Sequence, residues 1–127
     1  MLPITLLPET IAQADGFGPA AELKSFAGRL LVFTLGITRA AEQESLEVSV
    51  WGSSNQEDWG VKPITALPPK SYCGVYSVLV NLVSHPEVRY LRVHWRMKRW
   101  APGERIPLFG FYSFVEESGA RVRRAVA

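Results

Sequence analysis

Apolar and polar side chains alternate along much of this chain with a period of two residues, the pattern of a β-strand that buries one face. In residues 46–51 the apolar side chains that share one face are Leu46, Val48 and Val50. The side chains of the same segment that point the other way are Glu47, Ser49 and Trp51. Residues 74–83 repeat the alternation, with an apolar face made of Tyr76, Val78, Val80 and Leu82. Both segments are therefore predicted to be strands.

Three further apolar runs complete a set of five predicted strands. Residues 29–37 are almost entirely apolar, which is typical of a central strand buried on both faces. Gly36 inside this run indicates a bend or the close approach of another group. The other two strands are predicted over residues 89–100 and 108–115.

The start of the chain and the segments between the strands are richer in turn residues. Ile4–Leu7 is predicted to be an edge strand, a position that tolerates neighbouring prolines. Pro19–Ala27 is predicted to be a strand, although its alanines also fit one or two helical turns. The predicted loops cover residues 38–45, 52–60, 63–73, 84–87 and 101–107.

Seven or eight short strands without intervening helices predict an all-β fold in which two antiparallel sheets pack as a β-sandwich. We expect the topology to be that of a jelly roll or of a related two-sheet sandwich. A five-stranded nucleic-acid-binding barrel is the main competing fold, but it uses fewer strands. The 127 residues, 47% of them apolar, suffice for a single domain. We assign that domain to residues 1–119 and predict a basic, flexible tail over residues 120–127.

The composition argues against a membrane-spanning or secreted protein. The longest apolar run, residues 30–37, is far shorter than the roughly 20 residues that cross a bilayer. Residues 1–8 lack the positive charge and the uninterrupted apolar stretch of a secretion signal. Cys73 is the single cysteine, so we predict no intramolecular disulfide and expect a buried free thiol. A cytoplasmic protein with no membrane partner is the resulting expectation.

Charge is distributed unevenly along the chain. Residues 1–88 hold five basic and nine acidic side chains, whereas residues 89–127 hold nine basic and three acidic ones. An anionic partner would therefore be attracted to the carboxy-terminal third.

Residues 89–100 combine this positive charge with aromatic groups. Their alternation predicts a core face made of Leu91, Val93, Trp95 and Met97. The opposite face is predicted to present Tyr90, Arg92, His94, Arg96 and Lys98. Such a face suits contacts with phosphate or carboxylate groups together with stacking. Alternatively, these side chains pair with acidic neighbours such as Glu47 on an adjacent strand and only solvate the surface.

A polar turn follows the strand at residues 46–51. Backbone flexibility and side-chain-to-backbone hydrogen bonds can close a tight loop here, with Trp59 folding back over it. The residues expected to close the loop are Gly52, Ser53, Ser54, Asn55 and Asp58. Trp51, Trp59 and Trp100 lie at strand ends or in loops, where an exposed indole can stack on a sugar ring. A partly buried tryptophan that caps the sandwich is an equally good interpretation.

Two family resemblances are carried by these segments. The first rests on two segments, Leu46-Glu-Val-Ser-Val-Trp-Gly-Ser-Ser-Asn-Gln-Glu-Asp-Trp59-Gly and Val88-Arg-Tyr-Leu-Arg-Val-His94. They resemble, in that order, the strand–turn–tryptophan segment and a later strand of galactose-binding-like (discoidin-type) β-sandwiches. Residues from about Thr10 to Val115, including Gly28–Thr38, resemble small β-sandwich proteins encoded among tailed-phage and prophage structural genes. The second resemblance implies a non-enzymatic virion or assembly component. This chain departs from those proteins in residues 63–69 and in its cluster of arginines and tryptophans.

The sequence offers no convincing enzymatic constellation. The spacing of His85, His94 and Cys73 does not make a nucleophile–base pair or a zinc cluster. Gly16-Phe-Gly18 lacks the lysine and the helix of a phosphate-binding loop. The acid pairs Glu42/Glu44 and Glu57/Asp58 lie in or beside predicted loops, without the further oxygen ligands that calcium needs. We predict no catalytic residue, cofactor or metal.

The expected function is that of a non-enzymatic structural or protein-interaction β-sandwich, of prophage type. We expect it to associate with itself or another protein through exposed strand edges and the basic strand face. A carbohydrate-binding module that uses the loop tryptophans is the first alternative. Nucleic-acid binding through the basic strand face is the second. The residues predicted to form the binding surface are Tyr90, Arg92, His94, Arg96, Lys98, Trp51, Trp59 and Trp100.

Overall fold

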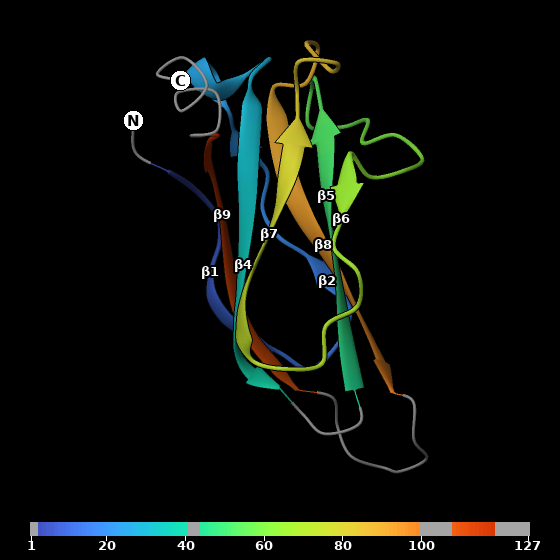
Figure 1. Ribbon diagram of the computed structural model, residues 1–127. Coiled ribbons are helices and arrows are strands. Elements are labelled where there is room, and N and C mark those ends of the chain that lie inside the picture. Colours follow the sequence, from blue (N-terminus) through green and yellow to red (C-terminus); the bar gives the residue numbers. More distant parts are fainter. Residues whose placement is uncertain (1–2, 41–43, 100–107, 119–127) are drawn as a thin grey trace, which may run out of the picture.

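The computed structural model describes residues 3–40, 44–99 and 108–118, and they form two antiparallel sheets packed face to face (Figure 1). The first six elements in chain order are β1 (Ile4–Ala12), β2 (Gly16–Phe17), β3 (Ala21–Glu22), the 3₁₀ turn η1 (Lys24–Phe26), β4 (Leu30–Ala40) and β5 (Glu44–Ser53). The remaining elements are β6 (Thr65–Ala66), β7 (Gly74–Asn81), β8 (Tyr90–Arg99) and β9 (Phe109–Glu117). The predicted all-β, two-sheet sandwich is confirmed.

The strands pair in a nested order. One sheet has the order β1-β9-β4-β7, and the other has the order β2-β8-β5-β6 with β3 also on β8. Strands β2 and β3 both pair with β8 on the side opposite β5, so they act as one interrupted edge strand. The first strand thus pairs with the last, the second with the next to last, and so on inward to the β5–β6 pair. This nesting of eight strands is the jelly-roll arrangement.

All five strands predicted from apolar runs are present, as β4, β5, β7, β8 and β9. Strand β4 lies between β9 and β7, as expected for the most apolar run. The predicted close approach at Gly36 is confirmed, because a Cβ there would collide with the ring of Tyr112. The predicted edge strand at the amino terminus is also present, and it continues past Pro8 to Ala12 with two register shifts. Such shifts let an edge strand accommodate a residue without an N–H donor.

Several predicted boundaries were wrong. Residues 38–40 and 44–45 belong to strands rather than to a loop, because they pair with β9 and β8. The predicted loop 63–73 contains β6, which pairs with Ser49 and Val50 of β5. Two residues are too few to carry an alternation, so only long-range pairing reveals this strand. The segment 19–27 is divided between β3 and η1, so the strand and the helical-turn interpretations each hold for part of it. Trp100, the loop 101–107 and the tail 120–127 lie outside the described residues.

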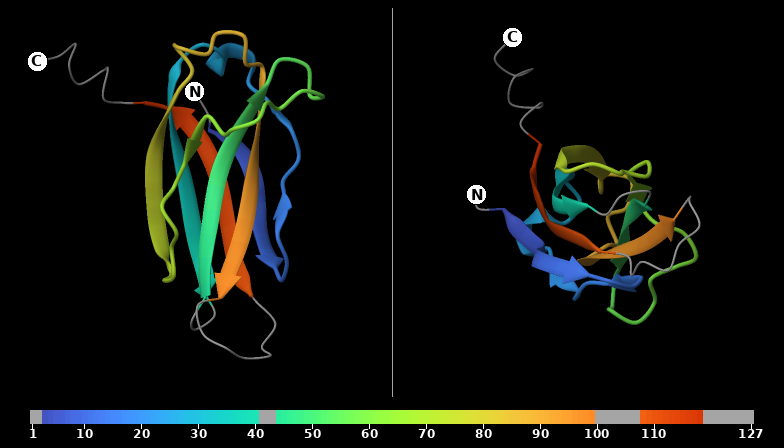
Figure 2. Two further views of the ribbon diagram at one scale, coloured as in Figure 1. Left: turned by 90° about the vertical axis from the view of Figure 1, so that its right-hand side faces the viewer. Right: turned by 90° about the horizontal axis from the view of Figure 1, so that it is seen from below.

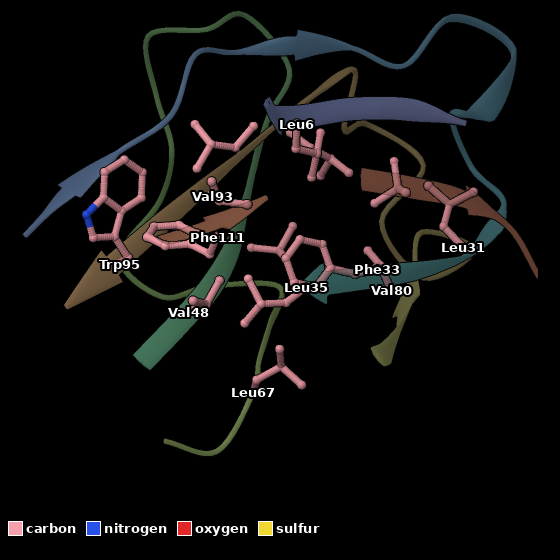
Figure 3. Close-up of a cluster of buried hydrophobic side chains, with 14 of the residues drawn as sticks. Leu6, Leu31, Phe33, Leu35, Val48, Leu67, Val80, Val93, Trp95 and Phe111 are labelled. Carbon is pink, nitrogen blue, oxygen red and sulfur yellow. The ribbon is translucent and has the colours of Figure 1, made fainter. Parts of the chain in front are cut away.

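The core lies between the two sheets and is built from the inward side of each alternation (Figure 3). From β4 the buried side chains are Leu31, Phe33, Leu35 and Ile37. From β5 and β8 they are Leu46, Val48, Val50, Leu91, Val93 and Trp95, as predicted. The indole of Trp95 packs edge-to-face on Phe111 at 5.3 Å between ring centroids, and its Nε1 donates to the carbonyl of Ala14 at 2.9 Å. The sandwich therefore has two outer faces that take no part in the core, one on each sheet.

Candidate functional site

Strand β8 presents the predicted basic face on the outside of the five-stranded sheet. It pairs with β5 over ten consecutive residues without a register shift. Arg92, His94 and Arg96 consequently stand opposite Trp51, Ser49 and Glu47. These six side chains lie on the solvent side, because their neighbours along each strand are in the core. The facing predicted from the sequence is confirmed.

Arg92 makes cation–π contacts with two aromatic rings. Its guanidinium carbon lies 4.4 Å from the ring centroid of Phe17 on β2 and 4.3 Å from that of Trp59 in the loop after β5. Cation–π contacts of this kind stabilise a guanidinium by about 0.5–2 kcal/mol each, more as water is excluded. We call the set Phe17, Trp51, Trp59, Arg92 and His94 the aromatic–arginine site.

The loop that contains Trp59 is closed by side-chain-to-backbone hydrogen bonds, as the sequence predicted. The hydroxyl of Ser53 accepts from the backbone N–H groups of Asn55 (3.1 Å) and Gln56 (2.9 Å). The Asn55 side-chain oxygen accepts from the N–H groups of Glu57 and Asp58, both at 2.9 Å. The Trp59 Nε1 then donates to the carbonyl of Gln56 at 3.0 Å. The loop lies toward the same end of the sandwich as the turn between β7 and β8 (Figure 2).

Replacing Asn55 by alanine is expected to lower the free energy of unfolding by about 1 kcal/mol, because two backbone donors lose their acceptor. Urea unfolding followed by circular dichroism measures the change. Ser54→Ala, at the neighbouring exposed position, is the control and should stay within about 0.5 kcal/mol of the parent protein. Equal effects of the two substitutions would contradict this account of the loop.

Two cavities meet on this face. One, of about 320 Å³, is lined by the five residues of the aromatic–arginine site and Gly60. The other, of about 440 Å³, lies over β5 and the 63–69 segment and is lined in part by Glu47, Ser49 and Arg96. Trp51 and His94 line both, so the cavities adjoin. The Trp51 Nε1 donates to the Ser49 hydroxyl at 3.0 Å, and its ring meets His94 edge-on at 6.4 Å between centroids.

The predicted surface residues are only partly brought together. Tyr90 begins β8 opposite Ser53 and lines neither cavity. Lys98 lies further along the strand, exposed, beside a third cavity with Asp15 and Glu47. Trp100 is outside the described part of the chain. Phe17 was missed, because nothing in Gly16-Phe-Gly18 shows that it will pair with the distant strand β8.

If the basic side chains of β8 only solvated the surface, they would be expected to pair with acidic neighbours. The structure shows fewer such pairs than this interpretation requires. Glu47 stands directly opposite Arg96. Within residues 3–40, 44–99 and 108–118, however, ion pairs are found only for Arg29 with Glu117 and for His85 with Glu87. Arg92 has neither an ion pair nor a hydrogen bond from its side chain in the described part of the chain, and its Nε is buried.

The outer face of the four-stranded sheet is different in character. Glu116, opposite Val32 near the end of β9, is an exposed charged residue on this face. The more central outward residues of β4, β7 and β9 are Val32, Thr34, Gly36, Val75, Ser77, Leu79, Tyr112 and Phe114. We call this set the apolar sheet face. None of the eight is charged, and the rings of Tyr112 and Phe114 are parallel with centroids 6.4 Å apart. Val75 and Leu79 are 68% and 54% exposed.

Polar contacts border this face. At the end where β4 begins, Arg29 Nη1 donates to Glu117 at 3.0 Å. Toward the end of β4, the Thr38 hydroxyl donates to Glu9 at 2.9 Å. An uncharged apolar patch with a polar border is typical of an interaction surface.

The prediction of a buried Cys73 was wrong. Cys73 is exposed, because it lies in the turn just before β7, ahead of the first inward side chain of that strand, Tyr76. The hydroxyl of Tyr76 donates to the carbonyl of Tyr72 at 2.7 Å and closes this turn.

Glu44 also departs from expectation, since it is buried at the start of β5 and accepts a hydrogen bond from the N–H of Leu108. Glu42 is not among the described residues.

Over the described ranges, no three His, Cys, Asp or Glu side chains are grouped to hold a metal ion. No helix in the same ranges is long and apolar enough to cross a bilayer. No protein-family model, curated protein or solved structure matches this chain. The resemblances to galactose-binding-like and phage structural sandwiches stay predictions.

Proposed function

We propose that this protein is a non-enzymatic structural or interaction protein that associates with a second copy of itself through the apolar sheet face. The observation that carries the proposal is the absence of charge from the eight residues of the apolar sheet face, with the charged Glu116 only at its end, opposite Val32. The jelly-roll topology and the resemblance to tailed-phage and prophage structural sandwiches support an assembly role.

A second copy is the partner whose chemistry this face matches best. A twofold axis brings identical patches together, so an uncharged apolar patch meets another uncharged apolar patch. Nearly flat sheet faces can pack about 10 Å apart in the way that the two sheets pack inside the sandwich. Removing Val75 and Leu79 from water contributes at most about 1.5–3 kcal/mol for each side chain.

The test is the absolute mass in solution of the parent protein and a Leu79→Lys variant, by size-exclusion chromatography with light scattering over a range of concentrations. We expect the parent protein to be a dimer or larger assembly. The variant should dissociate at least about tenfold more readily, because burying an unpaired ammonium opposes association.

Val61→Lys provides the matched control, since Val61 is 98% exposed and lies outside the apolar sheet face. It adds the same charge and should leave the mass unchanged. A parent protein that stays monomeric at every concentration would disprove the proposal. So would an assembly that Leu79→Lys and Val61→Lys weaken equally.

A further inference from the structure

The guanidinium of Arg92 lies over the rings of both Phe17 and Trp59 and finds no acceptor in the described part of the chain. Because its Nε is buried, a bound molecule can meet the edge of the guanidinium only at the terminal N–H groups. The buried Nε–H without an acceptor is a cost that a fold rarely carries at a purely structural position. Arg92 lies at the wall of the smaller cavity, so its side chain is placed to meet a bound molecule.

The two ring contacts also favour one kind of partner for Arg92, a carboxylate. A guanidinium presents donors in a planar fork that matches the two oxygens of a carboxylate. The contacts with the rings of Phe17 and Trp59 restrict the guanidinium before anything binds. Less side-chain freedom is then lost on binding, which raises affinity for an anion that approaches along the edge.

The remaining lining groups favour a saccharide as the carrier of that carboxylate. Trp51 offers a large, half-buried indole that is not used to stack on Arg92. Ser49, His94 and Glu47 provide hydroxyl, imidazole and carboxylate groups within reach of the same or the adjoining cavity. A sugar has an apolar C–H face and hydroxyl groups around its ring. It therefore suits an indole that is surrounded by hydrogen-bond donors and acceptors.

Nucleic acid fits these residues less well. Platforms for single strands rely on successive free aromatic faces and an unbroken basic track. Here two of the three large rings are occupied by Arg92. The basic track is also interrupted, because Glu47 stands opposite Arg96 in the adjoining cavity.

We infer that the aromatic–arginine site binds a carboxylated saccharide, whose carboxylate meets the edge of Arg92 and whose ring lies against Trp51. This site is on the opposite sheet from the apolar sheet face, so the inference does not depend on self-association.

The experiment is isothermal titration of the full chain with a panel of defined probes. The carboxylated probes are a galacturonate trisaccharide, a hyaluronan tetrasaccharide and sialyllactose. Their methyl esters keep the rings and remove the charge. A sulfated heparin tetrasaccharide and a short oligothymidylate represent the other anions. At least one carboxylated probe should bind, with its ester at least about tenfold weaker, because the ester cannot accept both hydrogen bonds of the fork.

Two variants locate the site and one serves as control. Arg92→Gln and Trp51→Ala should each weaken binding about tenfold or more. Lys98→Gln removes one positive charge from the same face of the same strand but lines neither cavity, so it should change affinity less than about twofold. Circular dichroism and the mass in solution should be the same for all three variants and the parent protein, which separates loss of the site from loss of the fold.

Several results would overturn the inference. One is that no carboxylated probe binds the parent protein, or that the esters bind as well as the acids. Another is that Arg92→Gln and Lys98→Gln weaken binding equally, which would indicate diffuse charge attraction. Tighter binding of the heparin fragment would assign the site to sulfate. Tighter and steeply salt-dependent binding of the oligothymidylate would assign it to nucleic acid.

Discussion

Replacing Trp95 by alanine is expected to lower the free energy of unfolding by about 3–5 kcal/mol. The indole is only 8% exposed and fills the space between β8 and Phe111. It also holds the short strand β2, since its Nε1 donates to Ala14 and a Cβ at Gly16 would lie 2.9 Å from its Cζ2. Urea unfolding followed by far-ultraviolet circular dichroism measures the loss.

This substitution has a second consequence for the aromatic–arginine site. Phe17 follows Gly16 on β2, so a looser β2 would also loosen a ring that contacts Arg92. Trp95→Phe is the control, because it keeps an aromatic ring in the core while it removes the hydrogen bond to Ala14 and part of the indole volume. It should cost clearly less than the alanine variant. A loss below about 1 kcal/mol for Trp95→Ala would show that this packing contributes little.

Replacing Phe33 by alanine should have an effect of similar size, again about 3–5 kcal/mol. Phe33 is completely buried on β4, between Val78 of β7 and Val115 of β9. The neighbouring strands cannot collapse into the space, because β4 is hydrogen-bonded on both sides. The residual cavity therefore adds to the lost transfer free energy. Thermal and urea unfolding of the purified variant measure the loss.

Ser77→Ala is the matched control for this prediction. Ser77 pairs with Thr34, the residue next to Phe33, but its side chain is exposed on the apolar sheet face. Its removal should change the free energy of unfolding by less than about 0.5 kcal/mol. If Ser77→Ala destabilised the protein as much as Phe33→Ala, the assignment of inner and outer faces on β4 and β7 would be wrong.

The two outer faces of the sandwich differ although the same alternation produces both. On the five-stranded sheet the outward positions carry charge and aromatic rings, and they border two cavities. On the four-stranded sheet the central outward positions of β4, β7 and β9 are uncharged, and charged groups such as Glu116 lie toward the ends. The proposed self-association and the proposed ligand binding would therefore use opposite sheets.

The sequence by itself determined the elements that can be recognised from a pattern within one continuous segment. Alternation over six or more residues predicted β5, β7 and β8, together with their inward faces, because side chains on a strand point to opposite sides. It also predicted the loop closed by Ser53 and Asn55, since those hydrogen bonds join residues two or three apart.

Only the tertiary structure decided what depends on partners far apart in the chain. The short strands β2 and β6 exist because β8 and β5 offer them hydrogen bonds, and no period can be detected in two residues. Phe17 and Trp59 meet Arg92 from separate segments, so their stack could not be predicted from any one of them. Cys73 was misplaced for the same reason, because its exposure depends on where β7 begins to face the core. Alternation specifies which way a side chain points, whereas strand pairing specifies what it meets.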